Sequence, residues 1–214
     1  MIKVVVLLIL LPLGISSTFN LICVFGDLLN KLDTINLFFL GGTVFSLFIV
    51  AKFREKLKFF STFEHELTHN IWAMIFFKKP MGFHVNTDGS GLFEYKSGGH
   101  FSNIFILLSP YFFPTACFLW LPFYVMCKEE YYWFYFLMMG VFFGYQIMST
   151  IQETGTYQTD ITTYGISFSY ATFIPLYIFF HGIILAHLNS GFGGVTNFIV
   201  EDNIANIEYL VALF

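Results

Sequence analysis

Residues 59–77 read FFSTFEHELTHNIWAMIFF, and this stretch decides how the rest of the chain is interpreted. Apolar and aromatic residues dominate it, and it is nearly as long as the roughly 20 helical residues that cross a membrane. Within it, His65 and His69 stand four residues apart, so on a helix both side chains point to the same side. Ionisable groups are costly inside a bilayer and usually have a functional reason. The stretch therefore predicts a membrane-associated helix that carries a functional site.

The order His65-Glu66-x-x-His69 is typical of helices that bind a catalytic metal ion. Two histidines on one helical face can each give a ring nitrogen to the same zinc ion. Glu66 lies next to the first histidine, where a carboxylate can act as general base on a water at the metal. The alternative is a helix whose histidines only form hydrogen bonds with neighbours. We favour the metal site because residues 64–69 place four ionisable groups in an otherwise apolar helix.

Composition places the chain among membrane proteins. Of its 214 residues, 57% are hydrophobic and only 11% are charged, and the mean hydropathy is +0.71. The formal net charge is −4, and no basic patch with interleaved aromatic residues occurs, which argues against nucleic-acid binding. The three cysteines have no metal-finger spacing. We therefore expect one multi-pass domain over residues 1–214, with the lipid bilayer as its surroundings.

Hydrophobic patterning predicts an all-α membrane fold, a bundle of about six transmembrane helices. The six apolar stretches cover about residues 4–25, 37–51, 59–77, 101–126, 131–150 and 166–187. Residues 83–96 differ, because they alternate between apolar and polar side chains around a glycine-containing segment. This pattern predicts a short β-hairpin in which Phe83–Asn86 pairs with Leu92–Lys96 around a turn at Asp88–Gly91.

A catalytic zinc site takes three protein ligands, so a third ligand must come from elsewhere in the chain. Asp160 is the first candidate, because it lies in a polar segment between the fifth and sixth apolar stretches. Glu153 is the rival, since glutamate is the third ligand of some zinc peptidases. Asp160 could instead be an ordinary loop or helix-cap residue.

Taken together, these motifs resemble the site-2 protease family of intramembrane zinc metallopeptidases, and most closely its compact bacterial branch. The resemblance rests on the histidine motif, on the turn residues Asp88-Gly89-Ser90-Gly91, on Ser109-Pro110-Tyr111 and on Thr159-Asp160. Two departures stand out. Thr68 occupies a position where the family usually has glycine, which should alter local helix packing. Ile161 follows Asp160 where a glycine is commoner.

The resemblance implies an intramembrane zinc metalloprotease that hydrolyses peptide bonds of membrane-protein or peptide substrates. In that case His65, His69 and Asp160 hold Zn²⁺, Glu66 is the catalytic base, and the catalytic core spans about residues 59–187. The family's hairpin implies that an unwound substrate segment is held by strand addition. A bacterial cytoplasmic membrane is the expected location.

A non-enzymatic function also fits the motif. The chain could be a non-catalytic scaffold or assembly subunit of the membrane that retains a metal site. Measured zinc content, and its loss when His65 is replaced, would separate a metal protein from a plain scaffold. The identity of the substrate and the oligomeric state leave no signal in the sequence.

Overall fold

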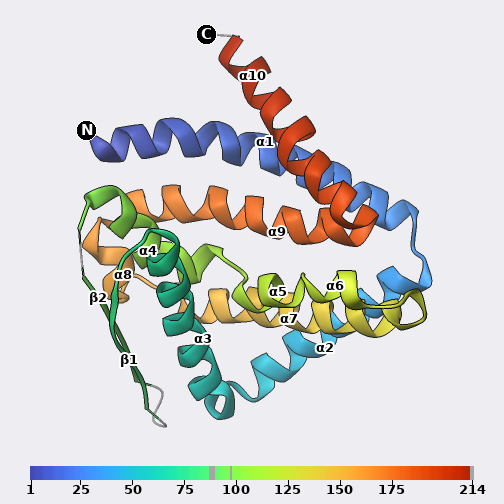
Figure 1. Ribbon diagram of the computed structural model, residues 1–214, viewed down its shortest axis with the longest axis horizontal. Helices are drawn as coiled ribbons and strands as arrows, with labels where there is room; N and C mark the ends of the chain where they lie inside the picture. Colours follow the sequence, from blue (N-terminus) through green and yellow to red (C-terminus); the bar gives the residue numbers. More distant parts are fainter. Residues whose placement is uncertain (87–89, 97, 213–214) are drawn as a thin grey trace.

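The computed structural model describes residues 1–86, 90–96 and 98–212, and it is mostly helical with one small hairpin (Figure 1). The elements in chain order are α1 (Ile2–Asn30), α2 (Thr34–Lys52), α3 (Arg54–Ile75), β1 (Pro80–Val85), β2 (Gly91–Tyr95), α4 (His100–Phe112), α5 (Thr115–Trp120), α6 (Phe123–Met126), the 3₁₀ turn η1 (Glu129–Tyr131), α7 (Tyr132–Glu153), α8 (Thr159–Thr163), α9 (Ile166–Thr196), the π-helical η2 (Asn197–Ile204) and α10 (Ala205–Ala212).

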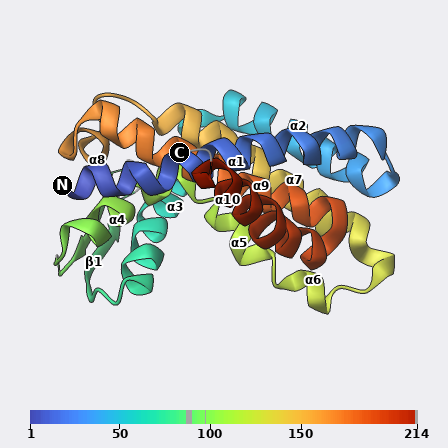
Figure 2. The same ribbon diagram turned by 90° about the horizontal axis from the view of Figure 1, so that it is seen from above.

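Two long helix pairs form the body of the molecule. Helix α1 packs along α9, and α2 packs along α7 (Figure 1). Helices α3 and α4 and the hairpin gather at one end, while α6 lies toward the other end (Figure 2). Many large apolar side chains of α1 and α2 remain exposed, including Leu8, Ile15 and Phe45. Exposed apolar surface of this extent suits contact with lipid.

The number of spans differs from the expected six. Within the described residues, four helices are long and apolar enough to cross a membrane, or five if the bent pair α4 and α5–α6 counts as one span. The stretch at residues 59–77 does form a helix, α3, but it is not among these candidates. Its charged N-terminal turns and its histidine motif lower its hydropathy. The apolar helices indicate an integral membrane protein.

The fourth apolar stretch, expected as one helix over residues 101–126, is broken. Helix α4 ends at Phe112, and the helical segment that follows is turned by 85°. Pro114 explains the break, because a proline disfavours helical geometry in the residue before it. That residue, Phe113, is extended, with φ −101° and ψ 113°. Helices α4 and α5, which lie on the two sides of the break, both pack against α3.

The predicted hairpin is confirmed. Strands β1 and β2 are antiparallel, with Phe83 opposite Phe93, and they begin and end within three residues of the expected positions. Residues 87–89 of the predicted turn lie outside the described residues. A left-handed residue, Phe77 at φ 55°, ends α3, and the amide of Lys78 donates to Ala73 O. This cap turns the chain directly from α3 into β1, so the hairpin lies beside the histidine motif.

Glycines permit the close packing of α2 against α7. A Cβ on Gly140 would collide with the backbone of Phe39, and one on Gly144 would collide with the backbone of Thr43. Small residues four positions apart commonly allow helices in membranes to approach each other closely. Gly41 of α2, in contrast, has nothing within 4 Å of the equivalent position.

We predict that Gly140→Ala destabilises the fold by about 1–3 kcal/mol, because the added methyl group must separate two packed backbones. Gly41→Ala is the matched control and should change stability very little. Thermal unfolding of the two variants in one detergent provides the measurement. Equal unfolding temperatures for both would contradict the packing described here.

Candidate metal centre

The histidine motif lies in the middle of α3, with His69 buried and His65 partly buried. Asp160 approaches from α8, a single short helix anchored by its neighbour Ile161. The Ile161 side chain is fully buried, and its carbonyl accepts a hydrogen bond from Ser169 Oγ at 2.7 Å. Anchored in this way, Asp160 reaches α3 across 91 residues of sequence.

His65, His69 and Asp160 converge on one point. The two Nε2 atoms each lie 3.4 Å from Asp160 Oδ2. One ligand atom from each residue lies within 4.8 Å of the other two, and no other metal-like cluster of three such residues occurs in the part of the chain that the structure describes. Two imidazole nitrogens and a carboxylate oxygen are a common donor set for zinc.

The second ring nitrogen of each histidine faces an acceptor. His69 Nδ1 lies 2.7 Å from the Ile106 carbonyl oxygen, and His65 Nδ1 lies 3.0 Å from Glu153 Oε2. Both Nδ1 atoms therefore donate, which leaves both Nε2 atoms for Asp160. This is the arrangement that metal-binding histidines usually have, with the remote nitrogen held by a carbonyl or a carboxylate.

Proline chemistry explains why the Ile106 carbonyl is available. In a helix this carbonyl would accept from the amide of residue 110, but Pro110 has no N–H. The freed oxygen accepts instead from His69 Nδ1 and from Ser109 Oγ, the latter at 2.8 Å. The Ser109-Pro110-Tyr111 element thus has a direct role in orienting His69.

Electrostatics shows that this cluster needs positive charge. With neutral rings, two nitrogen lone pairs and a carboxylate would face one another and repel, so the cluster is stable with protonated imidazoles or with a bound cation. Burial would raise the pKa of Asp160, but the hydrogen bonds and charges of protonated His65 and His69 outweigh burial and hold this pKa below its ordinary value. A bound cation would favour the ionised carboxylate in the same way, which suits Asp160 to hold a metal.

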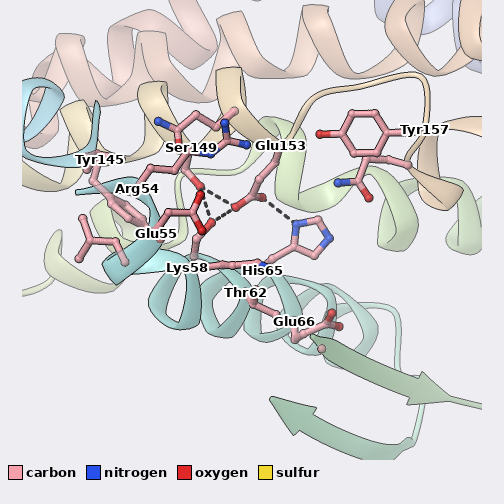
Figure 3. Close-up of a pocket in the computed structure, with 16 residues that line it drawn as sticks. Arg54, Glu55, Lys58, Thr62, His65, Glu66, Tyr145, Ser149, Glu153 and Tyr157 are labelled. Carbon is pink, nitrogen blue, oxygen red and sulfur yellow. Dashed lines mark hydrogen bonds and ion pairs between the residues drawn. The ribbon is translucent and has the colours of Figure 1, made fainter. Parts of the chain in front are cut away.

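Glu153, the rival third ligand, lies on the opposite side of the His65 ring from Asp160. Its carboxylate accepts from His65 Nδ1 and is itself held by Ser61 Oγ and by Ser149 Oγ, the latter at 2.9 Å. Figure 3 shows this network across the space between α3 and α7. Sequence reasoning did not find this contact, because nothing in the sequence of α7 shows that it packs beside His65.

A cleft of about 430 Å³ opens beside the cluster. His65, Glu66 and Glu153 line it, and so does Gly91 at the start of β2. A Cβ on Gly91 would lie 2.5 Å from Thr62 Cγ2 and 2.6 Å from Glu66 Oε1, so the hairpin meets α3 closely at this glycine. Figure 3 shows Glu66 on the side of α3 that faces the strands. Glu66 is therefore accessible from the cleft.

Two further histidines remain apart from this cluster. His181 Nδ1 donates to the Tyr177 carbonyl at 2.9 Å, within α9. His187 Nε2 lies 3.1 Å from the Tyr135 hydroxyl, among aromatic rings. Both are buried in the helical body and belong to its packing.

Thr68, one of the two departures from the family pattern, fits the local packing. It is fully buried, and its hydroxyl lies 2.5 Å from that of Thr115 on α5. The same hydroxyl donates to the Glu64 carbonyl at 2.8 Å. A polar contact between α3 and α5 therefore occupies the place where a glycine would allow closer approach.

Comparison with known proteins gives a match at the level of a family. No curated protein and no solved structure gave a significant match to the chain. The sequence profile described as "Peptidase M50B-like" matches residues 39–173, which include α3, the hairpin, α4, α7 and α8. The match covers more than half of the chain, and the chain therefore belongs to the Peptidase M50B-like family, which is the family of the site-2 proteases.

Proposed function

We propose that this protein is a zinc metalloendopeptidase that cleaves membrane-associated polypeptides, with His65, His69 and Asp160 as the metal ligands and Glu66 as the general base. The observation that carries the proposal is the convergence of the two Nε2 atoms on Asp160 Oδ2, each at 3.4 Å, beside a cleft lined by Glu66. When bound, zinc would polarise the peptide carbonyl and acidify the attacking water.

The chain's own residues supply the rest of the chemistry. Glu66 takes a proton from the attacking water and passes it to the leaving amine. The carbonyl of Ile106 and the carboxylate of Glu153 fix the two imidazoles in the tautomer that leaves Nε2 free. Orientation by fixed partners of this kind removes reorganisation during the reaction.

The hairpin supports the proposal of a polypeptide substrate. A helix cannot be cleaved while its carbonyls are held in backbone hydrogen bonds, so a substrate segment must be extended in the cleft. Among the described residues, neither strand pairs with a third strand. Strand β2 contacts the motif through Gly91 and through Phe93, whose ring stacks on that of His69 with 6.2 Å between the ring centroids. An extended substrate segment can pair with the edge of such a strand.

We predict that Glu66→Gln abolishes hydrolysis while zinc content and thermal stability stay near those of the wild type, because Glu66 is a base and not a ligand. The assay combines cleavage of a peptide mixture by the full-length zinc-loaded protein with metal analysis of the same samples. His69→Ala should instead lose the metal. Near wild-type cleavage by Glu66→Gln would end the peptidase proposal.

We also predict that Asp160→Asn lowers zinc affinity at least tenfold, because a neutral amide replaces the anionic ligand; even changes to groups that only orient a ligand cost about 10–100-fold. Glu153→Gln should lower it far less, since its amide oxygen can still accept from His65 Nδ1. Competition with a coloured chelator measures both affinities. If Glu153→Gln removes the zinc and Asp160→Asn does not, the assigned ligand set is wrong.

A further inference from the structure

The cleft runs along α3 from His65, the residue of the metal cluster that lines it, toward the N-terminus of this helix. Arg54 and Lys58 line this cleft together with His65. Steps of four, three and four residues lead from Arg54 through Lys58 and Ser61 to His65, so all four side chains lie on one helical face. These side chains therefore form a row that leads from Arg54 and Lys58 to His65.

These two cations differ from the other basic residues of the same segment. Lys52 and Lys56 extend over the ring of Phe53, at 5.4 and 5.6 Å from its centroid. Arg54 and Lys58 instead face the cleft, and neither forms an ion pair with any carboxylate in the part of the chain that the structure describes. Glu55 also lines the cleft but lies beyond ion-pair distance from both.

We propose that Arg54 and Lys58 form a subsite for an acidic side chain of the polypeptide substrate. The inference rests on the proposed peptidase function and adds a substrate class to it. At a rise of about 1.5 Å per helical residue, Lys58 lies roughly 10 Å and Arg54 roughly 16 Å along α3 from His65. An extended peptide advances about 3.3 Å per residue, so the acidic residue lies about three to five residues from the cleaved bond.

The arrangement of the residues that line the cleft suits an extended peptide. Gly91 of β2 lines the cleft near Glu66, and the N-terminal half of α3 lines it from Arg54 to His65. A peptide that lies between them runs parallel to the row from Arg54 to His65. Because both cations are solvent-exposed, each ion pair contributes only modestly, and the expected preference for an acidic side chain is roughly three- to tenfold.

The first experiment measures binding, which needs no turnover. Fluorescent ten-residue peptides, identical except for a central pair of Glu, Gln or Lys, are titrated into full-length zinc-loaded Glu66→Gln protein in detergent. We expect the Glu peptide to bind roughly three- to tenfold more tightly than the Lys peptide, with the difference shrinking at high salt. In the background of Arg54→Glu with Lys58→Glu, the preference should reverse.

Lys52→Glu with Lys56→Glu is the matched control, because it changes the net charge as much as the double reversal of Arg54 and Lys58. It adds negative charge beside the same end of α3, but both lysines extend over Phe53 and neither lines the cleft. The control should retain the preference for the Glu peptide. Equal binding of all three peptides, or an equal loss of preference in the control, would show that the cations serve only a general surface role such as contact with lipid phosphate, and would overturn the subsite.

The second experiment maps cleaved bonds by mass spectrometry after digestion of a mixed peptide library by the wild-type enzyme. Asp and Glu should be enriched three to five residues to one side of the cleaved bond, and the enrichment should vanish in the double charge reversal. Cleavage without this enrichment overturns the subsite but leaves the peptidase intact. Absence of cleavage, together with selective binding in the first experiment, would count against the peptidase alone.

Discussion

The hydrogen bond from His69 to the carbonyl of Ile106 is the contact on which the site depends. In a bilayer a backbone carbonyl without a donor is costly, and Pro110 deprives this carbonyl of its helical partner. The imidazole of His69 satisfies it at 2.7 Å, and the ring orientation that results directs Nε2 to Asp160. One missing amide in α4 therefore links the packing of α3 against α4 to the geometry of the metal centre.

The sequence predicted the local features of this protein better than its tertiary contacts. The helix that carries the histidine motif, the hairpin, and the helices expected at residues 4–25 and 166–187 each have a signal within 30 residues, and the structure has a helix or a hairpin at each of these places. The break at Phe113 also had a local signal in Pro114, but the apolar run around it led to a single predicted helix. That prediction followed the hydropathy of the apolar run and gave too little weight to the effect of the proline on the backbone.

The contact of Glu153 with His65 had no such signal. It depends on how α7 and α3 lie beside each other, which is set by glycine packing of α2 on α7 and by the α2–α3 connection. Sequence reasoning could offer Glu153 only as a carboxylate of suitable type and position. In the structure, Glu153 contacts Nδ1 of His65, and Asp160 contacts Nε2 of the same ring. The role of Asp160 as a ligand stays a prediction.

The packing of α1 has a consequence for how this molecule is made. Helix α1 leaves the ribosome before α9, η2 and α10, yet it packs chiefly against these later segments (Figure 1). Ser17 Oγ donates to Asn203 Oδ1 at 2.9 Å, and Asn206 Nδ2 donates to Asn20 Oδ1 at 2.9 Å. These polar groups meet their partners only after residues 203 and 206 have been synthesised. Until then the polar side chains of α1 lack these hydrogen bonds, a state in which binding by the insertion machinery would protect them.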